Sequence, residues 1–156
     1  MLRLHARHAR PAGFTLIEVL LALVILAVLV AIALPSYKQY RDRAMIAQAV
    51  NDIAAMNLHL RDYITQNHVA PPDLSAIGAT GKLDPWGNAY VYANLAVVGV
   101  GGARKDKNLV PINTDFDLYS KGKDGVSKLP LTTKDARDDV ILANDGKFIG
   151  LASDYE

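Results

Sequence analysis

The sequence contains no cysteine at any of its 156 positions. Disulfides are therefore excluded, as are thiolate nucleophiles and cysteine-ligated zinc. An excess of one charge is also missing, because 17 Lys and Arg face 16 Asp and Glu, and three of those arginines fall within residues 1–13. This balance gives no indication of nucleic-acid binding.

Catalytic motifs are absent as well. There is no Gly-x-Ser-x-Gly elbow, no phosphate-binding glycine loop and no His-Glu-x-x-His pair. Two of the four histidines lie within residues 1–13, and His59 and His68 have no suitably spaced acid to complete a metal or nucleophile site. We therefore predict that the protein is not an enzyme; a membrane-anchored enzyme or ligand-binding domain is the alternative.

The dominant feature that is present is an apolar run over residues 14–34. Of its 21 residues, fifteen are Leu, Ile, Val or Phe, four are Ala, and the other two are Thr15 and Glu18. As a helix it would span about 30 Å, enough for a bilayer core. The apolar side chains favour insertion by roughly 5–8 kcal/mol, whereas one acid costs at most about 3 kcal/mol. The run therefore predicts a membrane-spanning helix.

The flank before the run is basic, with Arg3, Arg7 and Arg10 and no acid. Positive flanks stay in the cytoplasm, so the C-terminal part is expected across the membrane. A secretory signal peptide is the rival interpretation, and it predicts cleavage after the run, near Ala31-Ile32-Ala33.

The segment Gly13-Phe14-Thr15-Leu16-Ile17-Glu18, followed by the apolar run, resembles the N-terminus of type IV prepilins and of the pseudopilins of type II secretion. The resemblance implies that a prepilin peptidase cuts between Gly13 and Phe14 and that Phe14 is then N-methylated. Glu18 is expected to act in assembly, because pairing with a neighbour's Phe14 amine would relieve two charges that are costly in lipid.

The expected organisation has four parts: a cytoplasmic leader (1–13), a transmembrane and filament-core helix (14–35), an amphipathic helix (36–66), and a globular region (67–156) that forms one domain with the amphipathic helix. Pro35 is expected to end or kink the apolar helix. Apolar residues recur at helical spacing between Ile46 and Ile64, which predicts a face packed on a sheet.

Strands are predicted over 89–92, 95–100, 116–120 and 148–151, and 138–143 is interpreted as a short helix or a strand. The predicted fold class is α+β, with one long N-terminal helix packed on a small antiparallel sheet and an Asp-rich loop near the C-terminus.

Two further motifs, Asp84-Pro85-Trp86-Gly87-Asn88 and the stretch 116–125, resemble the major pseudopilin of type II secretion. Six aspartates also crowd residues 115–139, and carboxylates in loops suit calcium, although aspartates in a solvated loop more often cap turns. The calcium site of that family implies Ca²⁺ ligands here, namely the Lys121 carbonyl, Asp124, Asp138 or Asp139, and more weakly Ser127.

The resemblance implies a structural subunit of a helical filament, a homo-oligomer that serves protein secretion. It implies residence in the bacterial inner membrane, with a periplasmic C-terminal domain, before assembly into a periplasmic or extracellular filament. Implied partners are the peptidase, an inner-membrane platform protein, an assembly ATPase and minor pseudopilins. A minor or major pilin of an adhesion, motility or DNA-uptake pilus is the alternative.

Overall fold

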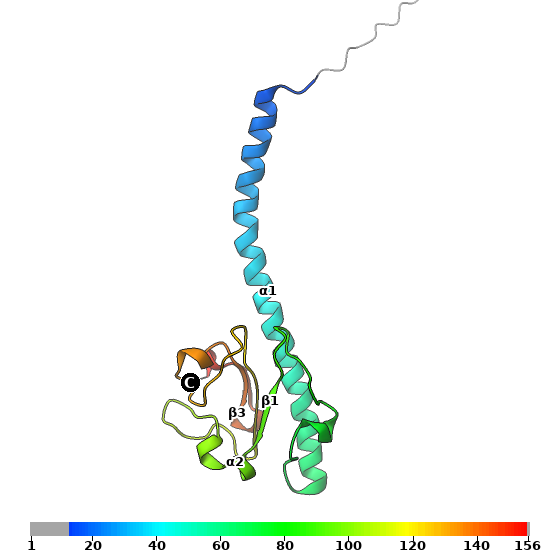
Figure 1. Cartoon of the computed structure of the whole chain (residues 1–156), viewed down its shortest axis with the longest axis vertical. Helices are drawn as coiled ribbons and strands as arrows, with labels where there is room; N and C mark the ends of the chain where they lie inside the picture. Colours follow the sequence, from blue (N-terminus) through cyan, green and yellow to red (C-terminus); the bar gives the residue numbers. More distant parts are fainter. Residues whose placement is uncertain (1–12, 156) are drawn as a thin grey trace, which may run out of the picture. The chain divides into compact units, whose positions relative to one another are not determined.

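The structure is a computed structural model, and it describes residues 13–155. The chain divides into two compact units, Met1–Tyr40 and Arg41–Glu156, and helix α1 (Leu16–Asn67) contributes residues to both (Figure 1). The second unit, called the head below, contains the sheet and both apolar cores.

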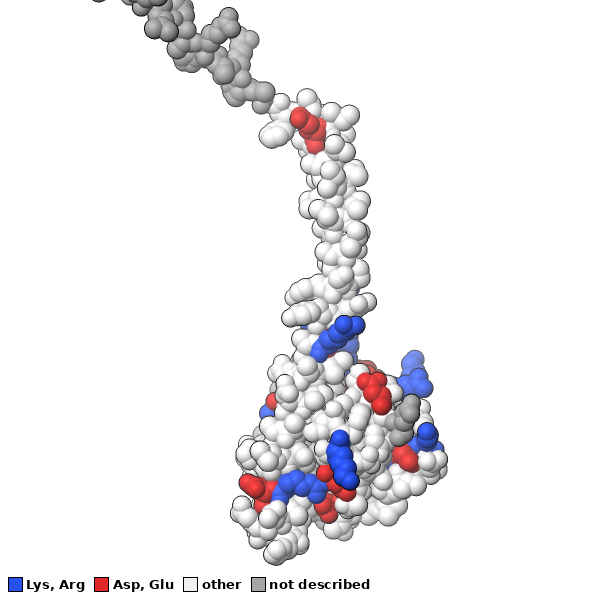
Figure 2. All heavy atoms as spheres, turned by 180° about the vertical axis from the view of Figure 1, so that it is seen from behind, with Lys and Arg blue, Asp and Glu red and all other residues white. Residues whose placement is uncertain are grey.

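The described residues of the first unit form no buried core. Every residue from 13 to 40 is exposed, and α1 is the one helix in the described chain that is long and apolar enough to cross a membrane. Figure 2 shows the apolar stretch of the helix without charged side chains, apart from an acid near its start. That acid is Glu18.

Pro35 does not end the helix, because α1 continues through it, as the prediction of one long helix requires; a kink at Pro35 stays a prediction. Proline removes one backbone hydrogen bond, here the bond to the Ala31 carbonyl. Ending the helix would leave several carbonyl groups unpaired in an apolar region, which costs more. A continuous helix therefore loses less free energy than a helix that ends at Pro35. The Ser36 hydroxyl adds a hydrogen bond to the Ile32 carbonyl at 3.3 Å.

The head contains one antiparallel sheet of four strands in sequence order. The strands are β1 (Val91–Asn94), β2 (Phe116–Ser120), β3 (Val140–Ala143) and β4 (Phe148–Leu151). The second and fourth occupy their predicted residues, the first begins two residues later than predicted, and the third is a strand rather than a helix. The α+β prediction is confirmed.

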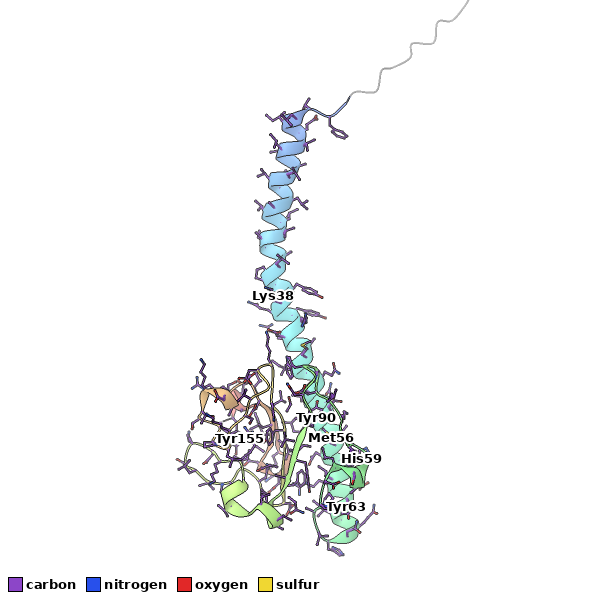
Figure 3. All side chains as sticks on the ribbon, in the orientation of Figure 1. Lys38, Met56, His59, Tyr63, Tyr90 and Tyr155 are labelled. Atoms are coloured by element: carbon purple, nitrogen blue, oxygen red, sulfur yellow. The ribbon has the colours of Figure 1, made fainter. Side chains whose placement is uncertain are left out.

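The apolar stripe of α1 packs on one face of this sheet, as its spacing predicted. Its four fully buried members are Ala49, Ile53, Met56 and Leu60. They form a single core with sheet residues that alternate along their strands, namely Phe116, Leu118, Val140 and Leu142. Met56 and Tyr90 of this core are labelled in Figure 3.

The opposite face of the sheet is covered too, which the sequence did not predict. A second core joins Ile112, Leu131, Ile141, Ala143 and Ala152, with Tyr119, Phe148 and Tyr155 packed around it. The segments before β2 and between β2 and β3 therefore form a layer over the sheet, opposite to α1.

The strand expected over 95–100 is wrong, because this stretch forms helix α2 (Leu95–Gly102). Asn94 caps it: its side-chain oxygen accepts the Ala96 N–H at 2.9 Å, while its side-chain nitrogen donates to the Ala70 carbonyl at 3.0 Å. Gly99, with φ of 65°, then interrupts the helical turn. Single-turn 3₁₀ helices complete the head: η1 (Leu74–Ile77), η2 (Lys134–Ala136), η3 (Asn144–Gly146) and η4 (Ala152–Asp154).

Candidate functional site

Glu18 is held within its own helix turn. The backbone N–H and the hydroxyl of Thr15 both donate to Glu18 Oε2 at 2.9 Å, and the Glu18 N–H donates to Thr15 Oγ1 at 3.3 Å. This reciprocal arrangement is a capping box, and it satisfies amide groups that a helix start leaves unpaired. It explains why α1 begins at Leu16. The Thr-x-x-Glu spacing of Thr15 and Glu18 is the sequence signal of such a box.

The expected cleavage point lies just before this box. Phe14 is 89% exposed, and no atom lies within 4 Å of the position that a Cβ on Gly13 would take. The junction between them is therefore open to another molecule. Residues 1–12 of the expected leader lie outside the described residues, and cleavage stays a prediction.

In the head, the two downstream motifs come together. The buried Asp84 carboxylate accepts the backbone N–H groups of Trp86 and Asn88 with one oxygen and the Ser120 hydroxyl with the other, at 3.0, 2.8 and 2.5 Å. The Asn88 side chain then donates to the Gly122 carbonyl at 2.9 Å. The Asp-Pro-Trp-Gly-Asn turn thus fixes the end of β2 and the turn that follows it.

Asp138 binds the turn after β2 from the other side. Its Oδ2 accepts the backbone N–H groups of Lys123 and Asp124, at 2.9 and 3.1 Å. Two successive N–H groups aimed at one anion form a nest. Gly122, with φ of 64°, allows this approach, since a Cβ there would overlap the Asp138 carbonyl. Asp124 is exposed and accepts the Val126 N–H at 2.8 Å.

Asp139 faces a different partner. It is fully buried, and its Oδ2 accepts a hydrogen bond from Arg104 Nη2 at 2.6 Å and from the Ser127 hydroxyl at 2.5 Å. Burial raises the pKa of Asp139 to about 6, and the charge of Arg104 and the bond from Ser127 offset part of the rise. At neutral pH the carboxylate is charged, and it forms a buried ion pair with Arg104.

A second buried acid holds the backbone of the same arginine. Asp117 accepts the Arg104 N–H at 2.6 Å and the Asn113 side-chain amide at 2.9 Å. Burial raises the pKa of Asp117, while these two hydrogen bonds lower it. The buried contacts of Arg104 were not predicted from the sequence, because Asp139 lies 35 residues further along the chain.

These contacts bear on the expected calcium site. Asp138 is directed at backbone amides, and Asp139 and Ser127 are directed at Arg104 and at each other. Among residues 13–155, no group of three or more histidine or acidic side chains is placed to hold a metal ion. Calcium needs six to eight oxygens, so the side chains as arranged do not fit it. Calcium binding through Lys121, Asp124, Asp138 or Asp139 stays a prediction.

Comparison with known proteins agrees with the N-terminal features. The family model "Prokaryotic N-terminal methylation motif" matches residues 9–34. Type II secretion system core protein G of Pseudomonas aeruginosa is 30% identical to this chain, and that of Escherichia coli is 31% identical. Each match covers 74% of this chain, and 86% and 84% of the respective relatives. The chain belongs to the type IV pilin and pseudopilin superfamily.

Type IV pilins match this chain over a length similar to that of the pseudopilins. The type IV major pilin protein PilE of Neisseria gonorrhoeae is 28% identical, over 87% of each chain. No solved structure matches the chain significantly. The relatives are structural subunits, which confirms the prediction that this protein is not an enzyme.

Proposed function

We propose that the protein is the repeating subunit of a pseudopilus that serves type II secretion. The observation that carries the proposal is the apolar first unit, in which all described residues are exposed and Glu18 is the only acid. An apolar surface of this length is stable only in lipid or against other helices. A subunit that moves from membrane to filament meets both environments.

Maturation prepares the assembly contact. Cleavage between Gly13 and Phe14 would remove the basic leader and create a positive amine one turn before Glu18. The amine of one subunit then pairs with the Glu18 carboxylate of its neighbour, which fixes the axial register of packed helices. Removing one partner of such a buried pair typically costs about 3–5 kcal/mol.

The cellular setting follows from this chemistry and from the superfamily. Before assembly, α1 anchors the subunit in the inner membrane, with the leader in the cytoplasm and the head in the periplasm. Assembly then requires a prepilin peptidase, a platform protein in the membrane, minor pseudopilins, and an ATPase that provides the energy for extracting the subunit from the membrane. The resemblance to the major pseudopilin family implies calcium stabilisation of the head, whereas the engaged carboxylates of Asp138 and Asp139 argue against it.

A type IV pilus is the second candidate, and the similarity to PilE favours it. The absence of cysteine favours the pseudopilus, because ordinary type IV pilins usually carry a C-terminal disulfide loop.

Deletion of the gene in its own host tests the proposal. We expect secreted proteins to accumulate in the periplasm, while surface pili and motility are unchanged. Complementation with the wild-type gene should restore secretion, and complementation with the Glu18→Leu variant should not. Normal secretion with lost pili would instead support the pilus candidate, and no change in either would contradict both.

A further inference from the structure

Arg104 is an unusual residue in the head, because it carries a full charge and is almost completely buried. Its side chain is 1% exposed, and the Asp139 side chain that it pairs with is 0% exposed. Its guanidinium carbon lies 4.1 Å from the centre of the Tyr119 ring. The side chain thus lies on the face of the sheet opposite to α1, beneath the second core.

The contacts of Arg104 join segments that are distant in the sequence. Its backbone N–H donates to Asp117 in β2, and its carbonyl accepts the Ile112 N–H at 3.1 Å. Its side chain donates to Ser127 at 2.6 Å and to Asp139, just before β3, at 2.6 Å. One residue therefore connects the segment before β2, β2 itself, the loop after it and the start of β3.

The neighbouring residue extends this junction. The Lys105 N–H donates to the Leu129 carbonyl at 3.0 Å, and the Leu131 N–H donates to the Lys105 carbonyl at 2.9 Å. Asp139 in turn accepts the Ala152 N–H with its carbonyl at 2.9 Å. The long connection between β2 and β3 is therefore attached beside Arg104, and the C-terminal segment is attached at Asp139.

A buried, ionised carboxylate needs hydrogen bonds and is stabilised further by a nearby positive charge, because desolvation would otherwise make the charged form very unfavourable. In calcium-binding loops a divalent cation supplies that charge. Here the guanidinium supplies it from within the chain, and the Ser127 hydroxyl donates to the same oxygen of Asp139. Ser127 and Asp139, two of the expected calcium ligands, are already engaged.

We propose that Arg104 acts as a built-in cation that fastens the layer over the sheet, residues 103–112 and 127–131, to β2 and β3, so that the head needs no divalent ion for its stability. The calcium prediction and this proposal require opposite results in the same measurement. The proposal is also independent of whether the filament serves secretion or a pilus.

The test uses the full chain in detergent micelles, with calcium or with a calcium chelator. Urea unfolding is followed through the fluorescence of Trp86, the only tryptophan and a residue packed on the first core. Endoproteinase Lys-C reports on the layer itself, by cleavage after the exposed Lys107 and Lys128. For the wild type we expect equal urea midpoints and equal cleavage rates in both solutions.

Variants separate the charge from packing. In Arg104→Gln a buried carboxylate loses its counter-charge, and we expect cleavage after Lys107 and Lys128 to accelerate at least about 100-fold. Arg104→Met combined with Asp139→Leu removes both charges and should recover much of the protection. Lys123→Gln is the matched control: it breaks an exposed ion pair with Asp42, and cleavage at the two sites should change less than about fivefold.

Two results would overturn the proposal. The first is a wild-type chain whose urea midpoint falls, or whose cleavage accelerates, when calcium is chelated. The second is an Arg104→Gln chain that is as resistant to Lys-C as the wild type. The wild-type comparison remains decisive even if the single variant does not fold.

Discussion

Gly122→Ala is the substitution whose effect on the head follows most directly from the geometry. Gly122 has φ of 64°, and a Cβ at this position would lie 2.8 Å from Asp138 Oδ2 and overlap the Asp138 carbonyl oxygen. Both atoms belong to the residue that accepts the amides of the same turn. The methyl group would therefore force Asp138 and the turn apart.

Two effects add up in this variant. A left-handed conformation costs a non-glycine residue about 1–2 kcal/mol, and forcing an extra methyl into a packed site costs about 1–3 kcal/mol. We expect a loss of about 2–5 kcal/mol in the free energy of unfolding, a large share of the 5–15 kcal/mol typical of whole domains.

The assay is urea unfolding of the full chain in detergent, followed through Trp86, with Gly81→Ala as the matched control. Gly81 has nearly the same φ, 66°, but no atom lies within 4 Å of its Cβ position. The control should therefore lose only the conformational part, about 1–2 kcal/mol. If both variants unfold at the same urea concentration, the close approach of Asp138 to the turn is refuted.

Three further predictions concern the N-terminus and the half-buried Tyr92. Gly13→Leu should block maturation and leave the precursor in the membrane, whereas the wild type should yield a chain beginning at Phe14 by intact mass; another N-terminus would contradict the cleavage site. Glu18→Leu should insert and be cut but polymerise poorly, with a loss of about 3–5 kcal/mol per contact. Glu18→Gln, which can still accept the cap bonds, should keep the helix start yet assemble poorly. Normal sheared filaments from Glu18→Leu would refute the pairing. Burial, helped by the nearby charges of Asp115 and Asp73, raises the pKa of Tyr92 from 10 to about 12. Tyr92 therefore ionises first in the unfolded chain, and the free energy of unfolding should fall as the pH rises from 10 to 12. Phenolate absorbance should show that Tyr92 ionises above pH 10, and a pKa of 10 for Tyr92 would contradict its burial.

The sequence predicted the elements that have a strong local pattern. The stripe on α1 follows helical spacing over five turns, and β2 and β4 alternate between faces, so their packing could be deduced from position alone. The run after Asn94 was misjudged because a short apolar stretch is compatible with either a strand or a helix. Whether this run forms a helix or a strand depends on Asn94, whose side chain bonds both the start of α2 and Ala70, more than 20 residues away.

The candidate site was only partly predictable, for a related reason. Asp124, Asp138 and Asp139 were singled out by the resemblance to the major pseudopilin, but their roles depend on which atoms face them in three dimensions. Nothing in the local sequence around Arg104 indicates that its side chain is buried against Asp139. The need of a buried acid for a counter-charge could be stated in advance, but the residue that supplies it could not.

The capping box at the start of α1 uses only one of the two oxygens of the Glu18 carboxylate. Both Thr15 bonds go to Oε2, and in the part of the chain that the structure describes Oε1 accepts no hydrogen bond. A neighbour's amine can therefore approach Oε1 without opening the box. A subunit in the proposed filament could join the next one without unwinding its own first turn, and polymerisation would not have to be offset by the loss of a helix cap.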